Sequence, residues 1–298
     1  MVNFLHFHRD LFESGKFKNK YMFKKYGIIG LTMIIVAQMG LFFRLQPIAQ
    51  WYFPIIWFGY IFLVDAIIYK LHGRSLISSR TKLFFLMLPI SSAIWWMFEC
   101  IGFILKNWYY TGLEGFGSRF WLFVFGTLSF ATVIPAIFET AMLLKTLHLF
   151  DRVRLKHEYR LTKRFLYTLI TLGIICLVLP VAFPFLFFPF IWVAFFLLLD
   201  PINYLHGRPS IISHLLDRKL SIPLSLYIGA TLCGFLWEFW NYWAIPKWHY
   251  TIPFVNFMKI FEMPLLGYLG YGPFGLELYA MYHFAASLFY HRETYIFK

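Results

Sequence analysis

The sequence predicts an all-α, polytopic transmembrane helical bundle of about eight helices, arranged as two parallel four-helix repeats. Hydrophobic residues make up 60% of the 298-residue chain and charged residues only 14%, which leaves too little polar surface for an ordinary soluble domain. Apolar runs of about 20 residues, the length that crosses a bilayer, recur along the chain. A pattern from the first half also returns about 135 residues later, as an internal repeat.

Eight apolar segments qualify as membrane-spanning helices by their length and composition. In chain order they are Tyr26–Phe43, Trp51–Lys70, Phe84–Leu105, Phe120–Leu144, Phe165–Phe183, Phe185–Tyr204, Leu220–Ile245 and Pro264–Phe289. The fifth and sixth meet at Phe183-Pro184 and could form one broken element instead. The repeat, however, pairs them with the first two helices.

The repeat also sets the predicted organisation of the chain: a basic N-terminal segment (1–25), a first repeat (26–150), a basic linker (151–164) and a second repeat (165–298). Four helices return the chain to its starting side, so both copies enter the membrane in the same direction. Apolar residues of the N-terminal segment share one helical face, which suits an amphipathic helix in the interface; a frayed basic tail fits equally well.

Basic residues indicate the orientation in the membrane, because short loops rich in Lys and Arg stay in the cytoplasm. Of the 27 lysines and arginines, the predicted outer side carries only Arg44, Lys106, Arg119, Lys247 and Lys259. We therefore expect a multi-pass protein of the cell membrane with both termini in the cytoplasm. The net charge of +13 then lies against anionic lipid and requires no nucleic acid partner.

Six of the 14 acidic residues fall within the predicted spans, at positions that match between the repeats. The pairs are Asp65 with Asp200, Glu99 with Glu238, and Glu139 with Glu277. A charged side chain at mid-membrane costs roughly 2.5 kcal/mol or more, so each acid must be neutral, paired or used. Bonds to arginines, indoles or hydroxyls would make the acids links between helices, but three matched pairs favour a functional role for at least one.

The two aspartates lie near the predicted cytoplasmic ends of their helices. Each is followed by a His-Gly-Arg turn, which ends in Arg74 in the first repeat and in Arg208 in the second. Glycine permits a sharp exit from the helix, and the arginine can reach back to the carboxylate or out to a lipid phosphate. We favour a structural role here, although the arginines would also suit a diphosphate substrate.

Amide side chains accompany the acids of the second repeat only. Asn203 and Asn241 each follow an acid by three residues, on the same helical face, where the first repeat has Ile68 and Gly102. This difference predicts that the amides bond the acids and that the second repeat keeps the chemistry. The simpler alternative is that each asparagine only satisfies its acid.

Prolines and aromatic residues surround the glutamates. Pro135 and Pro273 each stand one turn before a glutamate, where a proline bends a helix and makes room beside the carboxyl group. Trp240, Trp248 and Tyr250 cluster near Glu238. They suit an interfacial belt or a packed core, and also a pocket whose ring faces stabilise a carbocation.

The motifs of several other chemistries are missing from the sequence. It has no histidine boxes, no pair of intramembrane histidines for haem, no Gly-x-Ser-x-Gly and no phosphate-binding glycine loop. The three cysteines lack the spacing of a metal site. We therefore expect neither a metal nor a cofactor.

The order of an acid, Trp-x-Tyr about ten residues later and a proline-led glutamate resembles the membrane lycopene cyclases of the heterodimeric or fused type, among the carotenoid-processing proteins. The match falls on Glu99, Trp108, Tyr110, Pro135 and Glu139, and again on Glu238, Trp248, Tyr250, Pro273 and Glu277. The chain has Pro-x-x-x-Glu where that family has Pro-x-Glu-Glu. The resemblance implies an isomerase-type step of carotenoid biosynthesis without a cofactor, in which an acid protonates a polyene, a ring closes and a base removes a proton.

The leading hypothesis is an integral membrane enzyme of the cyclase, isomerase or hydratase type that acts on a lipophilic isoprenoid or carotenoid-like substrate. Glu238, Glu277 and Asp200 are the candidate catalytic residues, in an order that the sequence does not assign. Candidate substrate contacts are Asn203, Asn241, Trp240, Trp248, Tyr250 and Arg208, and the first-repeat equivalents are Asp65, Glu99, Glu139 and Arg74. The alternatives are a proton-coupled membrane transporter and an accessory or scaffold subunit of a membrane complex.

Overall fold

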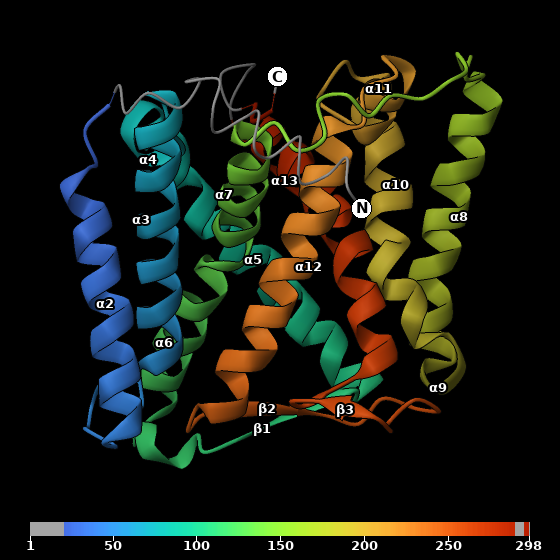
Figure 1. Ribbon diagram of the computed structural model, residues 1–298. Helices are drawn as coiled ribbons and strands as arrows, with labels where there is room; N and C mark the ends of the chain where they lie inside the picture. The colour runs from blue at the N-terminus through green and yellow to red at the C-terminus, as the bar shows by residue number, and fades with distance from the viewer. Residues whose placement is uncertain (1–20, 290–294, 298) are drawn as a thin grey trace.

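The computed structural model describes residues 21–289 and 295–297 and is mostly helical (Figure 1). The longer helices are α2 (Lys25–Phe42), α3 (Tyr52–His72), α5 (Thr81–Leu105), α6 (Arg119–Ala131), α7 (Val133–Thr146), α8 (Lys163–Ala182), α10 (Ile191–Leu205), α12 (Ser221–Trp243) and α13 (Tyr271–Phe289). Shorter helices and 3₁₀ turns are α4 (Leu76–Ser79), η1 (Glu114–Phe116), α9 (Pro184–Phe187), η2 (Phe188–Phe190), α11 (Ile211–Leu216) and η3 (Leu265–Gly270). The predicted interfacial helix of the N-terminal segment falls almost wholly outside the described residues.

Seven helical stretches of the described chain are long and apolar enough to cross a membrane. They are Lys25–Phe42, Tyr52–His72, Thr81–Leu105, Arg119–Thr146, Lys163–Ala182, Pro184–Leu205 and Ser221–Trp243, and they correspond to the first seven predicted segments. The chain is therefore a multi-pass membrane protein. The eighth predicted segment begins with the 3₁₀ helix η3 and is α-helical only from Tyr271, as α13, which lies in the bundle (Figure 1) but is not one of the seven.

The fourth predicted segment is interrupted at Thr132, between α6 and α7. The cause of the interruption is Pro135, which has no N–H to donate to the carbonyl of Ala131, the last residue of α6. Ser91 of α5 bonds both sides of the break, because its hydroxyl donates to the Phe130 carbonyl at 2.6 Å and accepts from the Ile134 N–H at 3.0 Å. The helix is thus interrupted before Glu139, next to the proline that was predicted to bend it.

Pro273 has a different place from the one predicted. It lies in the first turn of α13, after η3, and not inside a continuous helix. A proline is tolerated in a first turn because the N–H there has no helical partner. The prediction of a bend within a long eighth helix was therefore wrong.

Short connecting elements mark the two ends of the bundle. In Figure 1, α4 and α11 lie at one end, and α9, β1 (Trp108–Thr111), β2 (Lys247–Tyr250) and β3 (Lys259–Ile260) lie at the opposite end. β3 pairs with β4 (Met263–Pro264) in a small hairpin. The loops that were predicted to be cytoplasmic thus share one end, which we call the α4/α11 end.

A two-stranded ribbon joins the two halves at the other end. β1 pairs antiparallel with β2, so that Trp108 faces Tyr250 and Tyr110 faces Trp248. At the centre of the ribbon the rings of Tyr109 and His249 stack with centroids 5.2 Å apart. Residues that match in sequence thus stand at mirrored positions in the ribbon.

Candidate functional site

All six intramembrane acids are buried, with side chains at most 9% exposed. Since a buried carboxyl group is stable only when it is bonded or protonated, the donors that reach each one indicate its role. The members of each matched pair differ in these donors.

The two aspartates hold the turns at the α4/α11 end. Asp200 accepts hydrogen bonds from the backbone N–H groups of Ile211 and Ile212, at 2.7 and 2.9 Å, at the start of α11. Asp65 accepts from the Ile77 N–H of α4 at 2.8 Å and from the Ser75 hydroxyl at 2.7 Å. Each aspartate thus fixes a short helix that follows its His-Gly-Arg turn, which supports the structural role expected for this pair.

The arginines of these turns do not bond the aspartates. Both Asp200 oxygens are taken by backbone amides, and the Arg208 guanidinium lies 5.6 Å from the centre of the Phe284 ring. Arg74 is exposed. The sharp exit itself is confirmed, because Gly73 and Gly207 have φ values of +80° and +65°, a conformation that favours glycine.

Glu99 has donors on both carboxylate oxygens. Its Oε1 accepts from the Trp95 indole at 2.9 Å and from the Tyr110 hydroxyl at 2.5 Å, and its Oε2 accepts from the Trp108 indole at 3.3 Å. The Trp108 ring can reach the carboxylate because α5 has a glycine beside it: a Cβ at Gly102 would lie 2.3 Å from that ring. Glu99 therefore links α5 to β1.

Glu238 has donors on one oxygen only. Its Oε1 accepts from the Tyr250 hydroxyl at 2.8 Å and from the Tyr271 hydroxyl at 2.5 Å. Its Oε2 is buried and has no hydrogen-bond partner. The Trp248 indole donates to Tyr250 at 2.9 Å, whereas the matching Trp108 donates directly to its carboxylate. Glu238 is thus held in place with one oxygen unused.

Two substitutions between the halves account for this difference. Asn241 stands where the first half has Gly102, and a side chain there excludes the ring position that Trp108 occupies. Gly234 stands where the first half has Trp95, and its missing side chain leaves room for the Tyr271 ring, which a Cβ would approach to 2.2 Å. Tyr271 thus replaces one indole donor, and the donor to the second oxygen is lost.

Tryptophan rings lie beside Glu238 in the core. Trp57 of α3 packs edge-on against Trp240 with centroids 4.8 Å apart, and lies 5.2 Å from Trp237. Trp237 in turn lies 6.1 Å from the Tyr271 ring. The Trp57 indole nitrogen is buried without a partner. These rings join α3 to the turn of α12 that carries Glu238.

The third pair also differs between the halves. Glu277 of α13 accepts at Oε1 from the Phe195 N–H of α10 at 2.8 Å, and its Oε2 has no partner. Glu139 of α7 is fully buried, and neither of its oxygens has a hydrogen-bond partner. The Asp65 carboxyl group of α3 is close enough to interact with it electrostatically.

The asparagines do not bond the acids as predicted. Asn241 exchanges two hydrogen bonds with the backbone of Trp248, at 2.8 and 2.9 Å, and so fixes β2. The Asn203 amide donates to the Ala280 carbonyl of α13 at 2.9 Å. Both amide side chains bond backbone groups of other segments instead of the acid one turn away on their own helix.

Two tyrosines at the acids were missed by the sequence analysis. Tyr271 bonds Glu238 from the start of α13, and Tyr26 of α2 donates to Asp65 at 2.5 Å. Tyr271 follows a glycine-rich stretch whose approach to α12 could be suspected from composition. Nothing in the spacing of Tyr26 pointed to Asp65, because the contact depends on how α2 packs on α3.

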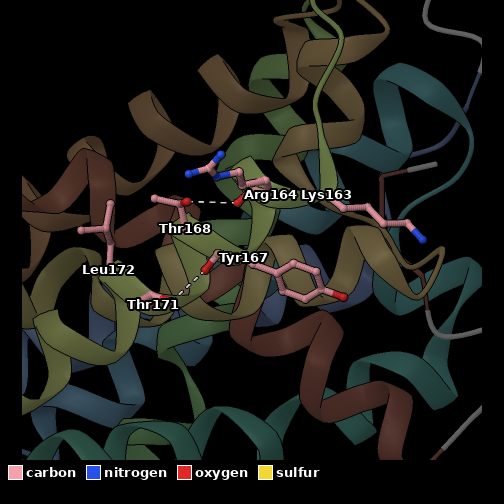
Figure 2. Close-up of a pocket in the computed structure, with 6 residues that line it drawn as sticks. All are labelled: Lys163, Arg164, Tyr167, Thr168, Thr171 and Leu172. Carbon is pink, nitrogen blue, oxygen red and sulfur yellow. Dashed lines mark hydrogen bonds between the residues drawn. The ribbon is translucent and has the colours of Figure 1, made fainter.

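A surface depression lies on α8, away from the acids. Figure 2 shows its lining: Lys163, Arg164, Tyr167, Thr168, Thr171 and Leu172. Thr168 and Thr171 donate their hydroxyls to carbonyls of the same helix, one turn earlier. Because one helix supplies the whole lining, we interpret the depression as relief on the outer face of the bundle.

Within the described part of the chain, no group of three or more His, Cys, Asp or Glu side chains could hold a metal ion. No family model, curated protein or solved structure matches this chain.

Proposed function

We propose that the protein is an integral membrane enzyme in which Glu238 acts as a general acid on a lipophilic, isoprenoid or carotenoid-like substrate. The observation that carries the proposal is the one-sided bonding of this carboxyl group. Two tyrosine hydroxyls donate to Oε1, so a proton on the acid resides on Oε2, which faces no competing acceptor. Such a proton is available to a bound substrate.

The chemistry follows from that arrangement. The Oε2 proton adds to a carbon–carbon double bond, and the carbocation formed is attacked by a neighbouring double bond of the same molecule, which closes a ring. A carboxylate then removes a proton from the ring, so the product is an isomer of the substrate. Trp57, Trp237 and Trp240, which pack together in the core, are the aromatic rings proposed to stabilise the cation.

Glu277 is the proposed base. It lies six residues after Tyr271 on α13, which is roughly 9 Å along a helix axis, a distance that an extended polyene can bridge. One oxygen is fixed by the Phe195 N–H and the other is without a partner. Asp200 is not assigned to catalysis, because both of its oxygens bond backbone amides.

The two halves are proposed to be parallel four-helix repeats, of which the second carries this site. The mirrored pairing of β1 with β2 and the shared capping by Asp65 and Asp200 support the repeat. The contrast between Glu99, with donors on both oxygens, and Glu238 supports the assignment to the second. The resemblance to lycopene cyclases supplies the substrate class.

Conversion of an acyclic carotenoid in proteoliposomes tests the proposal. Glu238→Gln should abolish conversion, because an amide cannot donate the proton, and should leave the protein folded. Tyr250→Phe and Tyr271→Phe each remove one donor to Oε1, and should lower the rate by about 10²-fold or less. Products are measured by chromatography and mass spectrometry.

Glu99→Gln is the matched control, because Glu99 has the same type of site but no free oxygen. It should retain conversion. Full conversion by folded Glu238→Gln would refute the proposal, and so would an equal loss in both variants. If the wild-type protein converts none of a panel of acyclic polyenes, the substrate class is wrong.

A further inference from the structure

Glu139 of α7, in the first half, is the buried acid with the fewest hydrogen bonds. Its side chain is fully buried, and both carboxylate oxygens lack a hydrogen-bond partner. An ionised carboxylate in such a place is strongly disfavoured, so the group either holds a proton or is the end of a path along which protons move. The neighbouring side chains distinguish these roles.

The groups around Glu139 form a connection toward the α4/α11 end. Asp65, on the adjacent α3, interacts electrostatically with Glu139. Asp65 in turn accepts from the Tyr26 hydroxyl in the first turn of α2 and from the Ser75 hydroxyl at the start of α4. Tyr26 is partly exposed, whereas Asp65 and Glu139 are fully buried. The order from the end of the bundle inward is therefore Tyr26, Asp65, Glu139.

The other titratable groups near Glu139 do not supply a counter-charge. From α3, Tyr60 bonds Thr140 at 2.8 Å, and from α12, Cys233 contacts the same hydroxyl at 3.2 Å. From α13, Tyr279 and Tyr282 pack against the preceding Phe138. All of these are neutral groups.

The second half does not have this connection. Glu277 bonds the Phe195 N–H, and Asp200 gives both oxygens to backbone amides. Gly30 of α2 and Gly173 of α8 pack against equivalent positions of their neighbouring helices, Leu63 and Leu198. Tyr26 and Leu169 each stand four residues before these glycines, so Leu169 is the second-half equivalent of Tyr26. Leucine cannot relay a proton, so the polar path belongs to the first half alone.

We propose that Glu139 is a proton-binding site, connected to the α4/α11 end of the bundle by a relay through Asp65 and Tyr26. The relay is independent of the chemistry proposed at Glu238. It gives the first half a function of its own, the uptake or release of a proton inside the bundle from the α4/α11 end. The sequence led us to expect the chemistry in the second repeat, and this proposal adds a role for the first.

Infrared spectroscopy of the protein in liposomes tests this proposal, because a protonated carboxyl group has a C=O band that shifts when its proton is exchanged for deuterium. We expect Glu139→Gln to remove one such band. In Tyr26→Phe, deuteration of that band should slow by about tenfold or more, because exchange must then proceed by local opening of the helices. Tyr26→Phe leaves the bonds from Ser75 and Ile77 to Asp65, so α4 stays capped and the fold is retained.

Asp65→Asn provides a second variant and should slow the same exchange. Glu277→Gln is the matched control: the band that it removes should exchange at the same rate with and without Tyr26. The proposal is overturned if Glu139→Gln removes no protonated-carboxyl band at any pH from acid to alkaline. It is also overturned if deuteration shifts that band in folded Tyr26→Phe as fast as in the wild type.

Discussion

At the scale of single residues, the buried acids differ by the number of donors that reach them. Asp200 receives two backbone amides, Glu99 three side-chain donors, Glu238 two donors on one oxygen, and Glu139 none. A missing hydrogen bond on a buried oxygen costs more than a typical bond contributes. The incomplete sites are therefore where a proton or a substrate has most to add.

The capping role of Asp200 gives a prediction about stability. Asp200→Ala should lower the free energy of unfolding by about 2 kcal/mol, because two buried N–H groups of α11 lose their acceptor. Asp200→Asn keeps one acceptor oxygen and should lose less. Unfolding in detergent micelles measures both. Equal stability of Asp200→Ala and the wild type would contradict the capping role.

Glu262 gives a prediction about pH, at the end of the molecule that carries the ribbon. Burial opposes its ionisation, but hydrogen bonds from Lys247 at 2.7 Å and His249 at 3.1 Å hold the pKa of Glu262 below its usual value of 4.5. A lowered pKa means that the ionised group stabilises the fold above pH 4.5 and that this stabilisation is lost as the pH falls through the lowered pKa.

Glu262→Gln should accordingly lower the free energy of unfolding by ~1 kcal/mol at neutral pH, with the difference from the wild type shrinking in acid. Thermal unfolding in micelles as a function of pH measures the effect. The exposed Glu114 at the same end provides the control, since Glu114→Gln should have little effect. A difference that grows in acid would contradict the ion pair.

The sequence was sufficient to identify the six acids but not their partners. Hydropathy places Asp65 or Glu277 in a span whatever its neighbours are, whereas some of the donors come from segments far along the chain. Tyr271 reaches Glu238 across 33 positions, and Tyr26 reaches Asp65 across 39. The prediction for Asn241 failed for the same reason, because its partner is a strand backbone that only the folded chain brings near.

At the scale of elements, glycines set how closely the outer helices approach the bundle. A Cβ at Gly30 would lie 2.5 Å from the Gly59 carbonyl oxygen and 2.8 Å from the Leu63 nitrogen of α3. On the other side, a Cβ at Gly173 would lie 2.5 Å from the Leu198 nitrogen of α10. These are backbone atoms, so α2 and α8 cannot accommodate a methyl group without moving.

Gly30→Ala should therefore separate α2 from α3 and destabilise the protein by about 1–3 kcal/mol. Because α2 carries Tyr26, the same change should also weaken the bond to Asp65. The control is Gly270→Ala, where no atom lies within 4 Å of the added Cβ and the change should be within about 0.5 kcal/mol. Similar stabilities of the two variants would contradict the close packing of α2.

Long helices were predictable because a span must be about 20 residues and apolar, and the first seven predicted segments coincide with the observed spans. The short elements were not. β1 and β2 have the aromatic composition of an interfacial belt, and only their pairing across the two halves makes them strands. The start of α13 was misplaced because the preceding turns are as apolar as a helix.

At the scale of the whole molecule, basic residues gather at the α4/α11 end of the bundle. The loop before α8 carries Arg152, Arg154, Lys156 and Arg160. The backbone of Arg154 forms an isolated antiparallel β-bridge with that of Lys219, after α11. The described residues of the opposite end include the ion pair of Glu262 with Lys247. This charge difference favours a cytoplasmic location of the α4/α11 end.

Cysteine labelling of intact cells tests that orientation. Glu114→Cys, on the ribbon side, should react with a membrane-impermeant maleimide, whereas Glu158→Cys, in the loop before α8, should react only after permeabilisation. Both positions are exposed, so access to the reagent decides the result. The parent protein controls for its three native cysteines. The opposite labelling pattern would reverse the orientation.

The ribbon of β1 and β2 donates hydrogen bonds to both Glu99 and Glu238. Tyr110 of β1 bonds Glu99 and is paired with Trp248, and Tyr250 of β2 bonds Glu238 and is paired with Trp108. A shift of either strand therefore disturbs the cover over both carboxyl groups. The hydrogen bonds of the two carboxyl groups are therefore coupled through the ribbon, so a substitution that displaces β1 also alters the bonds at Glu238.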